Sequence, residues 1–261
     1  MNRQAQAVVL LLLGGAVIRA SLTDLYLNYV KEGLRPFLVA AGILLVVAAI
    51  MTLWYELRPA RPAPVPAGGA PDGPGLEGHD APGHDGHGHD DGHGHHEPRV
   101  GWLLILPVLG LLLVAPPALG SYAAGQAGTA LSSQQQPSDY PPLPEGDPVR
   151  VGVLDYASRA LFDKGTSIGD RRVLITGFVA KGPDGQPILA RIVLSCCAAD
   201  GRPVKLGLTG NVPAGLADDT WVEVTGRYSD RVAADPVNDA EIPYLDVESW
   251  KQVPTPKRQY E

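Results

Sequence analysis

Residues 36–55 read PFLVAAGILLVVAAIMTLWY, a stretch without one charged side chain. An α-helix rises 1.5 Å per residue, so about 20 residues cross the roughly 30 Å hydrocarbon core of a bilayer. Residues 100–119, VGWLLILPVLGLLLVAPPAL, are equally long and equally uncharged. We therefore expect two membrane-spanning helices, near residues 36–57 and 100–120.

The first apolar stretch, near residues 5–30, is interrupted by Arg19 and Asp24. A cleaved signal peptide is the alternative to a retained helix, with Arg3 ahead of its apolar core. The residues before Ala20 make a poor small-residue cleavage site, so we favour the retained helix, with Arg19 reaching lipid head groups or a partner helix. The sequence thus predicts a membrane α-helical N-terminal region of three spans.

Lys and Arg residues near the span ends predict an orientation, because cytoplasmic loops collect positive charge. One side of the membrane carries Arg3, Arg58, Arg61 and Arg99, and the other carries Lys31 and Arg35. We expect a multi-pass protein of the cell membrane. Its N-terminus and 58–99 loop would be cytoplasmic and its C-terminal domain extracytoplasmic.

All 7 histidines lie in that loop, interleaved with aspartates; they are His79, His84, His87, His89, His93, His95 and His96. Imidazole binds Zn²⁺, Ni²⁺ and Cu²⁺, and carboxylates such as those of Asp85 and Asp90 complete such sites. Compositional drift in a polar loop is the alternative. The Pro and Gly content of residues 58–99 predicts disorder, so we expect weak binding of several ions rather than one fixed centre.

A linker rich in Pro, Ser and Gln, residues 121–149, leads to a segment at 150–253 with the mixed composition of a water-soluble domain. A short strand at 151–154 and a helix from Asp155 to about Phe162 are expected first. Five strand-like stretches separated by turn signals follow, at 171–181, 188–197, 204–208, 220–228 and 243–253. They predict a small all-β C-terminal domain, for which we favour an OB-like barrel over a sandwich. Residues 254–261 form a tail.

The chain has 2 cysteines, the adjacent Cys196 and Cys197, with Asp200 close behind. If strand 188–197 is half-buried, alternation turns Cys196 inward with Ile192 and Leu194, and turns Cys197 outward. Three interpretations stay open: cysteines with no task beyond packing, a thiol or soft-metal site that includes Asp200, and a strained vicinal disulfide.

Three segments carry a resemblance over nearly the whole chain: Cys196-Cys197-Ala198-Ala199-Asp200, Trp221-Val222-Glu223-Val224-Thr225-Gly226 and Pro116-Pro117-Ala118-Leu119-Gly120-Ser121. In these the sequence resembles the YcgQ-like bacterial membrane proteins, described as permease subunits. The resemblance implies a larger polytopic permease as partner and involvement in metal homeostasis. The tail departs from the family's Pro- and Tyr-rich ending, because Lys257-Arg258-Gln259-Tyr260 stands here.

These observations exclude some functions and favour others. The C-terminal domain has no histidine, so its own residues cannot form a Ser–His–Asp or Cys–His pair, and we expect no enzymatic activity. The near-neutral charge of residues 150–261 offers no basic face for nucleic acid. We expect an accessory permease subunit linked to transition-metal handling, in contact with membrane lipid, with self-association as a further option. The alternative is a membrane-tethered extracytoplasmic binding module without a transport role.

Overall fold

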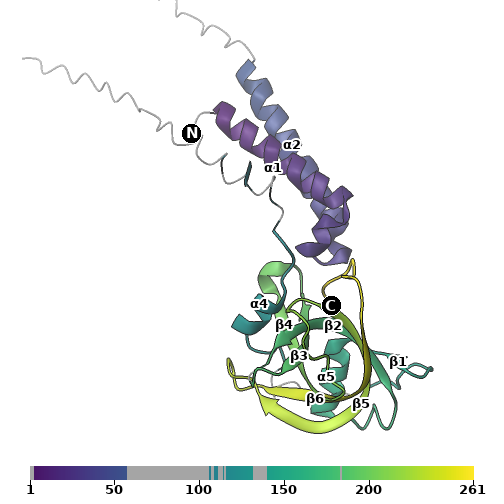
Figure 1. Cartoon of the computed structure of the whole chain (residues 1–261). Coiled ribbons are helices and arrows are strands. Elements are labelled where there is room, and N and C mark those ends of the chain that lie inside the picture. The colour runs from purple at the N-terminus through teal and green to yellow at the C-terminus, as the bar shows by residue number, and fades with distance from the viewer. Residues whose placement is uncertain are drawn as a thin grey trace, which may run out of the picture.

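The computed structural model describes residues 3–57, 106, 109–110, 114, 116–131, 140–182 and 184–261. The predicted His-rich loop at 58–99 lies outside these residues, as does most of the predicted third span at 100–120. In the described part, a helical hairpin stands beside a small β-barrel (Figure 1).

The hairpin consists of α1 (Arg3–Leu22) and α2 (Arg35–Leu57), joined through the short 3₁₀ helices η1 (Asp24–Asn28) and η2 (Glu32–Leu34). We expected the first span to reach about residue 30, but α1 ends at Leu22. Thr23 folds its hydroxyl back onto the carbonyl oxygens of Arg19 and Ala20, at 3.2 and 3.1 Å, and Asp24 then starts η1. In the described part of the chain, Glu32–Tyr55 is the one helix with the length and composition to cross a membrane. Of the three predicted spans, the structure therefore supports one, the second.

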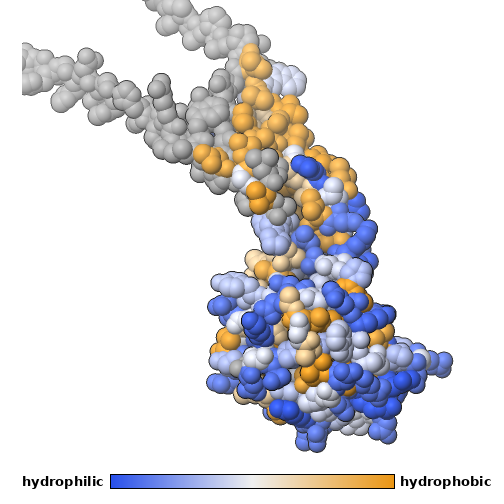
Figure 2. Space-filling model, viewed as in Figure 1, coloured by the Kyte–Doolittle hydropathy of each residue, from blue (hydrophilic) through white to orange (hydrophobic). Residues whose placement is uncertain are grey.

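Glycines let the two helices approach closely. A Cβ atom at Gly42 would lie 2.6 Å from Ile18 Cγ1, and one at Gly14 would lie 3.0 Å from the carbonyl oxygen of Gly42. A Cβ at Gly15, by contrast, would meet nothing within 4 Å. Gly14 and Gly42 thus form the hairpin's internal contact, as small residues do between membrane helices. On the face that Figure 2 shows, the hairpin is mostly hydrophobic away from the barrel and hydrophilic next to it.

The C-terminal part is a closed barrel of five strands, which confirms the predicted small all-β barrel and is consistent with an OB-like fold. The strands are β2 (Val173–Lys181), β3 (Pro187–Val193), β4 (Arg202–Gly210), β5 (Trp221–Ala234) and β6 (Glu241–Gln252). They follow the order β2-β3-β4-β6-β5, and β2 pairs with β5 to close the barrel. The β4–β6 pair is parallel, whereas the other barrel pairs are antiparallel. The short β1 (Val149–Arg150) adds to β2.

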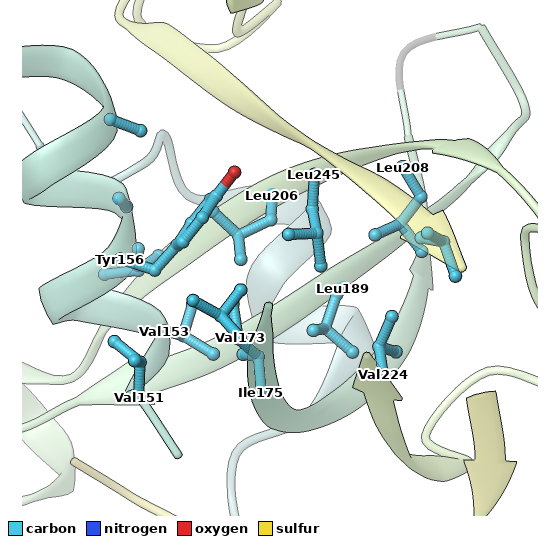
Figure 3. Packing of buried hydrophobic residues seen from close by; sticks show 14 of the residues in the cluster. Val151, Val153, Tyr156, Val173, Ile175, Leu189, Leu206, Leu208, Val224 and Leu245 are labelled. Carbon is cyan, nitrogen blue, oxygen red and sulfur yellow. The ribbon is translucent and has the colours of Figure 1, made fainter. Parts of the chain in front are cut away.

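Helix α5 (Val153–Phe162) packs its apolar face against the barrel interior (Figure 3). Its Val153 and Tyr156 are fully buried among strand residues such as Leu206 and Leu245. The Tyr156 hydroxyl donates a hydrogen bond of 2.6 Å to the carbonyl oxygen of Tyr244, which satisfies the one polar atom that this ring brings into the core. The predicted start of the helix at Asp155 was two residues late.

Strand β3 is buried on both faces, which the expectation of a half-buried strand had missed. Leu189 points into the barrel core. Ile188, Ala190, Ile192 and Leu194, which we expected to face that core, belong instead to a second cluster with Phe178 and Trp221. Helix α4 (Ser121–Gln126) and Tyr260 cover this outer cluster.

Described parts of the 121–149 segment pack on the barrel, although its composition suggested little to bury. Leu131 and Leu143 join the barrel core. The Thr129 backbone N–H donates to Asp235 Oδ2 at 2.8 Å, and the Lys205 ammonium lies 2.8 Å from the same oxygen. This carboxylate is fully buried, and the two donors compensate its charge.

Candidate functional site

The predicted thiol site lies in a tight turn between β3 and β4. Strand β3 ends at Val193, and the Leu194 N–H donates to the carbonyl oxygen of Glu261 in the tail. The chain then turns around the Asp200 carboxylate, which accepts the backbone N–H groups of Ser195 at 2.9 Å, Cys196 at 2.8 Å and Cys197 at 3.3 Å. Cys197 caps the 3₁₀ helix η4 (Ala198–Asp200) through its sulfur, which accepts the Asp200 N–H.

This turn brings together all three residues of the predicted site. The sulfurs of Cys196 and Cys197 and a carboxylate oxygen of Asp200 lie within 4.8 Å of one another. In the described part of the chain, no other group of three or more His, Cys, Asp or Glu side chains offers ligand atoms so close together. Both cysteines are free thiols.

The predicted inward position of Cys196 is wrong. Its side chain is exposed and that of Cys197 is half-buried. Strand β3, which would have set their alternation, ends at Val193, three residues before Cys196. It ends there because the Asp200 carboxylate competes for the backbone N–H groups that a longer strand would pair. The hypothesis that a buried cysteine fills the core is thereby excluded for Cys196.

The electrostatics of the turn follow from its hydrogen bonds. The Cys196 thiol and then the backbone N–H groups of Cys196, Ser195 and Cys197 stabilise the Asp200 carboxylate and lower its pKa to about 2. Hydrogen bonds with Asp200 and Cys197 raise the pKa of Cys196 to about 11. At neutral pH Cys196 is therefore a protonated thiol, which argues against a free nucleophile.

The turn also contacts the loop of the helical hairpin. The Lys31 N–H donates to the Cys196 carbonyl oxygen at 3.0 Å, and the Ala198 N–H donates to that of Tyr29 at 2.7 Å. Val30 and Cys197 form an antiparallel bridge between these bonds. The Lys31 ammonium reaches the Leu194 carbonyl oxygen at 3.3 Å. The cysteine turn is thus one side of a junction between the barrel and the hairpin.

The tail forms the other side of this junction. Lys257 pairs with Asp24 at 2.9 Å and Arg258 pairs with Glu32 at 2.8 Å. The Tyr260 hydroxyl donates to the Asn28 carbonyl oxygen at 2.9 Å and accepts the Leu119 N–H at 2.7 Å. Single-sequence reasoning gave the tail no role. The sequence shows that the tail is basic and that the hairpin loop carries acidic residues, but a single sequence does not show that these residues pair.

A cavity of about 340 Å³ lies within the junction. Its lining combines apolar side chains, including Leu27 and Leu194, with the charged ends of Lys31, Glu32 and Arg258. The predicted metal ligands of the loop, from His79 to His96 with Asp85 and Asp90, lie outside the described residues.

A family model described as the DUF1980 C-terminal domain matches residues 160–261. The match covers all five barrel strands, the cysteine turn and the tail, and it leaves out the helical hairpin. No curated protein and no solved structure matches the chain. The likeness to the DUF1980 C-terminal domain agrees with the expectation of an uncharacterised family, and it makes the cysteine turn and the tail parts of one matched domain.

Proposed function

We propose that the chain is an accessory subunit of a membrane permease system, in which the hairpin joins the partner's helices and carries the barrel at the membrane surface. The observation that supports this most is the junction, where the cysteine turn and the tail both hold the loop at 24–34. A barrel attached at two places to a membrane hairpin is a positioned module rather than a freely tethered one.

The hairpin needs further apolar partners. Large apolar side chains on its outer surface are exposed, among them Phe37 at 69%, Leu44 at 68% and Ile43 at 51%. Lipid or other helices must cover them. The three predicted spans are too few for a transporter built from paired repeats, so a transport role requires a polytopic partner or self-association.

The path of the chain favours the predicted third span. Helix α2 has 23 residues, about 35 Å at 1.5 Å per residue, and carries the chain away from the barrel (Figure 1). By Pro116 the chain is back beside the hairpin loop, since the Tyr29 hydroxyl donates to the Pro116 carbonyl oxygen at 2.7 Å. The chain therefore has to come back from the end of α2 to Pro116, and the uncharged residues 100–119 have the length of the predicted third span.

Affinity purification of the tagged chain from native membranes in mild detergent tests the proposal. We expect a polytopic permease, identified by mass spectrometry, to co-purify. Lys257→Glu combined with Arg258→Glu opposes Asp24 and Glu32 with like charge and should reduce the recovered permease. Adding Asp24→Lys and Glu32→Lys should restore it.

The control is Lys181→Glu combined with Arg202→Glu, which makes the same charge change at exposed barrel positions. Recovery of the chain without any polytopic protein, in wild type and control alike, would contradict the proposal and favour a tethered binding module. If the junction variant and the control recover equal amounts of permease, the permease is still a partner of the chain, but the junction is not needed to bind it.

A further inference from the structure

We propose that Cys196, Cys197 and Asp200 bind one thiophilic divalent cation of the Zn²⁺ class through two thiolates and one carboxylate, with a fourth coordination position open to solvent. This inference goes beyond the permease proposal and does not depend on it, because metal binding is a property of the chain alone.

The turn holds the Asp200 carboxylate, its oxygen ligand, in place before any ion binds. Three backbone N–H groups fix the Asp200 carboxylate at 2.8–3.3 Å. Those bonds come from the residues that carry the two thiols and from their neighbour Ser195, so the carboxylate and the sulfurs are held on one small loop. Hydrogen bonds to a ligating carboxylate orient it and tune its affinity for a metal.

The distances suit a metal centre. With Zn–S bonds of about 2.3 Å, two sulfurs in a tetrahedral site lie about 3.8 Å apart. The three ligand atoms here already lie within 4.8 Å of one another. Between the two sulfurs the remaining gap is therefore at most about 1 Å, and side-chain rotation at Cys196, whose thiol is exposed, can narrow it.

The chemistry of binding is a proton exchange. Two thiols lose their protons to solvent as one divalent cation enters and two sulfur–metal bonds form. Two sulfur ligands select a soft or borderline cation over Mg²⁺ or Ca²⁺. The exposure of Cys196 leaves one side of the ion accessible, so water or a donor from another molecule would fill the fourth position and the ion could be exchanged.

The site lies where binding would also affect the junction. The backbone carbonyl of Cys196 and the N–H of Ala198 both bond to the hairpin loop. An ion that fixes the turn would therefore also fix the barrel against the hairpin, and the exchange of the Lys31 and Ala198 amide protons should slow when the ion is bound.

Cobalt titration of the full-length chain in detergent, reduced with a phosphine, tests the site. A thiolate bound to Co²⁺ gives a charge-transfer band in the near ultraviolet, and histidine ligands do not. Because Cys196 and Cys197 are the chain's 2 cysteines, such a band reports on this turn even if the His-rich loop binds cobalt as well. We expect saturation at one thiolate-bound Co²⁺ per chain, and loss of the band on adding Zn²⁺.

Variants sharpen the assignment. Asp200→Asn should weaken cobalt binding at least about tenfold, since loss of even an outer-shell partner typically costs 10–100-fold. Asp218→Asn, at an exposed aspartate away from the turn, should leave it unchanged, and so should replacing all seven loop histidines by Gln. Absence of the band from the reduced wild-type chain would overturn the proposal. So would saturation at half an ion per chain, which indicates a site shared between two molecules.

Discussion

Cys196 and Cys197 are neighbours with different surroundings, and this difference can be measured. The Cys196 thiol is exposed, and that of Cys197 is half-buried and accepts the Asp200 N–H. In metal-free buffer, the ratio of the modification rates with a bulky and a small maleimide should therefore be higher for Cys197→Ser, which keeps Cys196, than for Cys196→Ser, because the ratio cancels the difference in thiolate fraction between the two thiols. The midpoint of urea unfolding of Cys196→Ser should equal that of the wild type, because no core contact is lost. A lower bulky-to-small rate ratio at Cys196 than at Cys197, or a clearly lower midpoint for Cys196→Ser, would restore the inward position that strand alternation predicted.

Gly42 and Gly15 offer a second comparison between single residues. Gly42→Leu would drive a side chain into Ile18 of α1 and should cost about 1–3 kcal/mol in hairpin packing. Gly15→Leu has open space and gains helix propensity, so it should fold at least as well as the wild type. Thermal unfolding in detergent, followed by size-exclusion chromatography, separates the two. Equal behaviour of the variants would show that the helices do not pack through Gly42.

At the scale of single elements, the sequence predicted where the strands lie and which residues share a face, but not what covers each face. Every predicted barrel strand overlaps an observed one, because the turn residues between them, such as Asp184-Gly185, break the period clearly. The end of β3 was missed by four residues because the acceptor that stops it, Asp200, acts through a side chain. The two buried faces of β3 were also missed, since alternation shows which residues share a face and not what covers that face.

Truncations on the two faces of β3 test this description. Leu189→Ala and Ile192→Ala each remove a side chain with 1% exposure or less, from the barrel core and from the outer cluster respectively. Both should lower the free energy of unfolding by about 2–5 kcal/mol. Val237→Ala, at a side chain that is 49% exposed, should change it by less than about 0.5 kcal/mol. A small effect for Leu189→Ala would mean that the strand has one buried face, as the sequence alone suggested.

At the scale of the whole molecule, the tail side of the junction connects residues that are 233 positions apart, Asp24 and Lys257. Lys257 donates a hydrogen bond to the Asp24 carboxylate and holds its pKa below the usual range. A carboxyl group with a lowered pKa stabilises the junction above its ordinary pKa of 3.8 and loses this contribution as the pH falls through the lowered value. Both side chains are mostly exposed, so salt should weaken the pair as well. No local pattern in the sequence could have predicted this contact, because it exists only once the barrel and the hairpin are both folded.

The junction also makes the membrane orientation testable with single cysteines. Because the barrel bonds to the loop between α1 and α2, a crossing by α2 would put the barrel and this loop on one side of the membrane, and residues 58–99 are predicted on the other side. The charge distribution predicts that the barrel lies outside. In a Cys196→Ser/Cys197→Ser background, a membrane-impermeant maleimide should therefore label Ser138→Cys in intact cells, and label Ala70→Cys only after the cells are opened. The reverse pattern would place the barrel and its thiols in the reducing cytosol. Labelling of both from outside would contradict the return crossing between Leu57 and Pro116, and with it the third span.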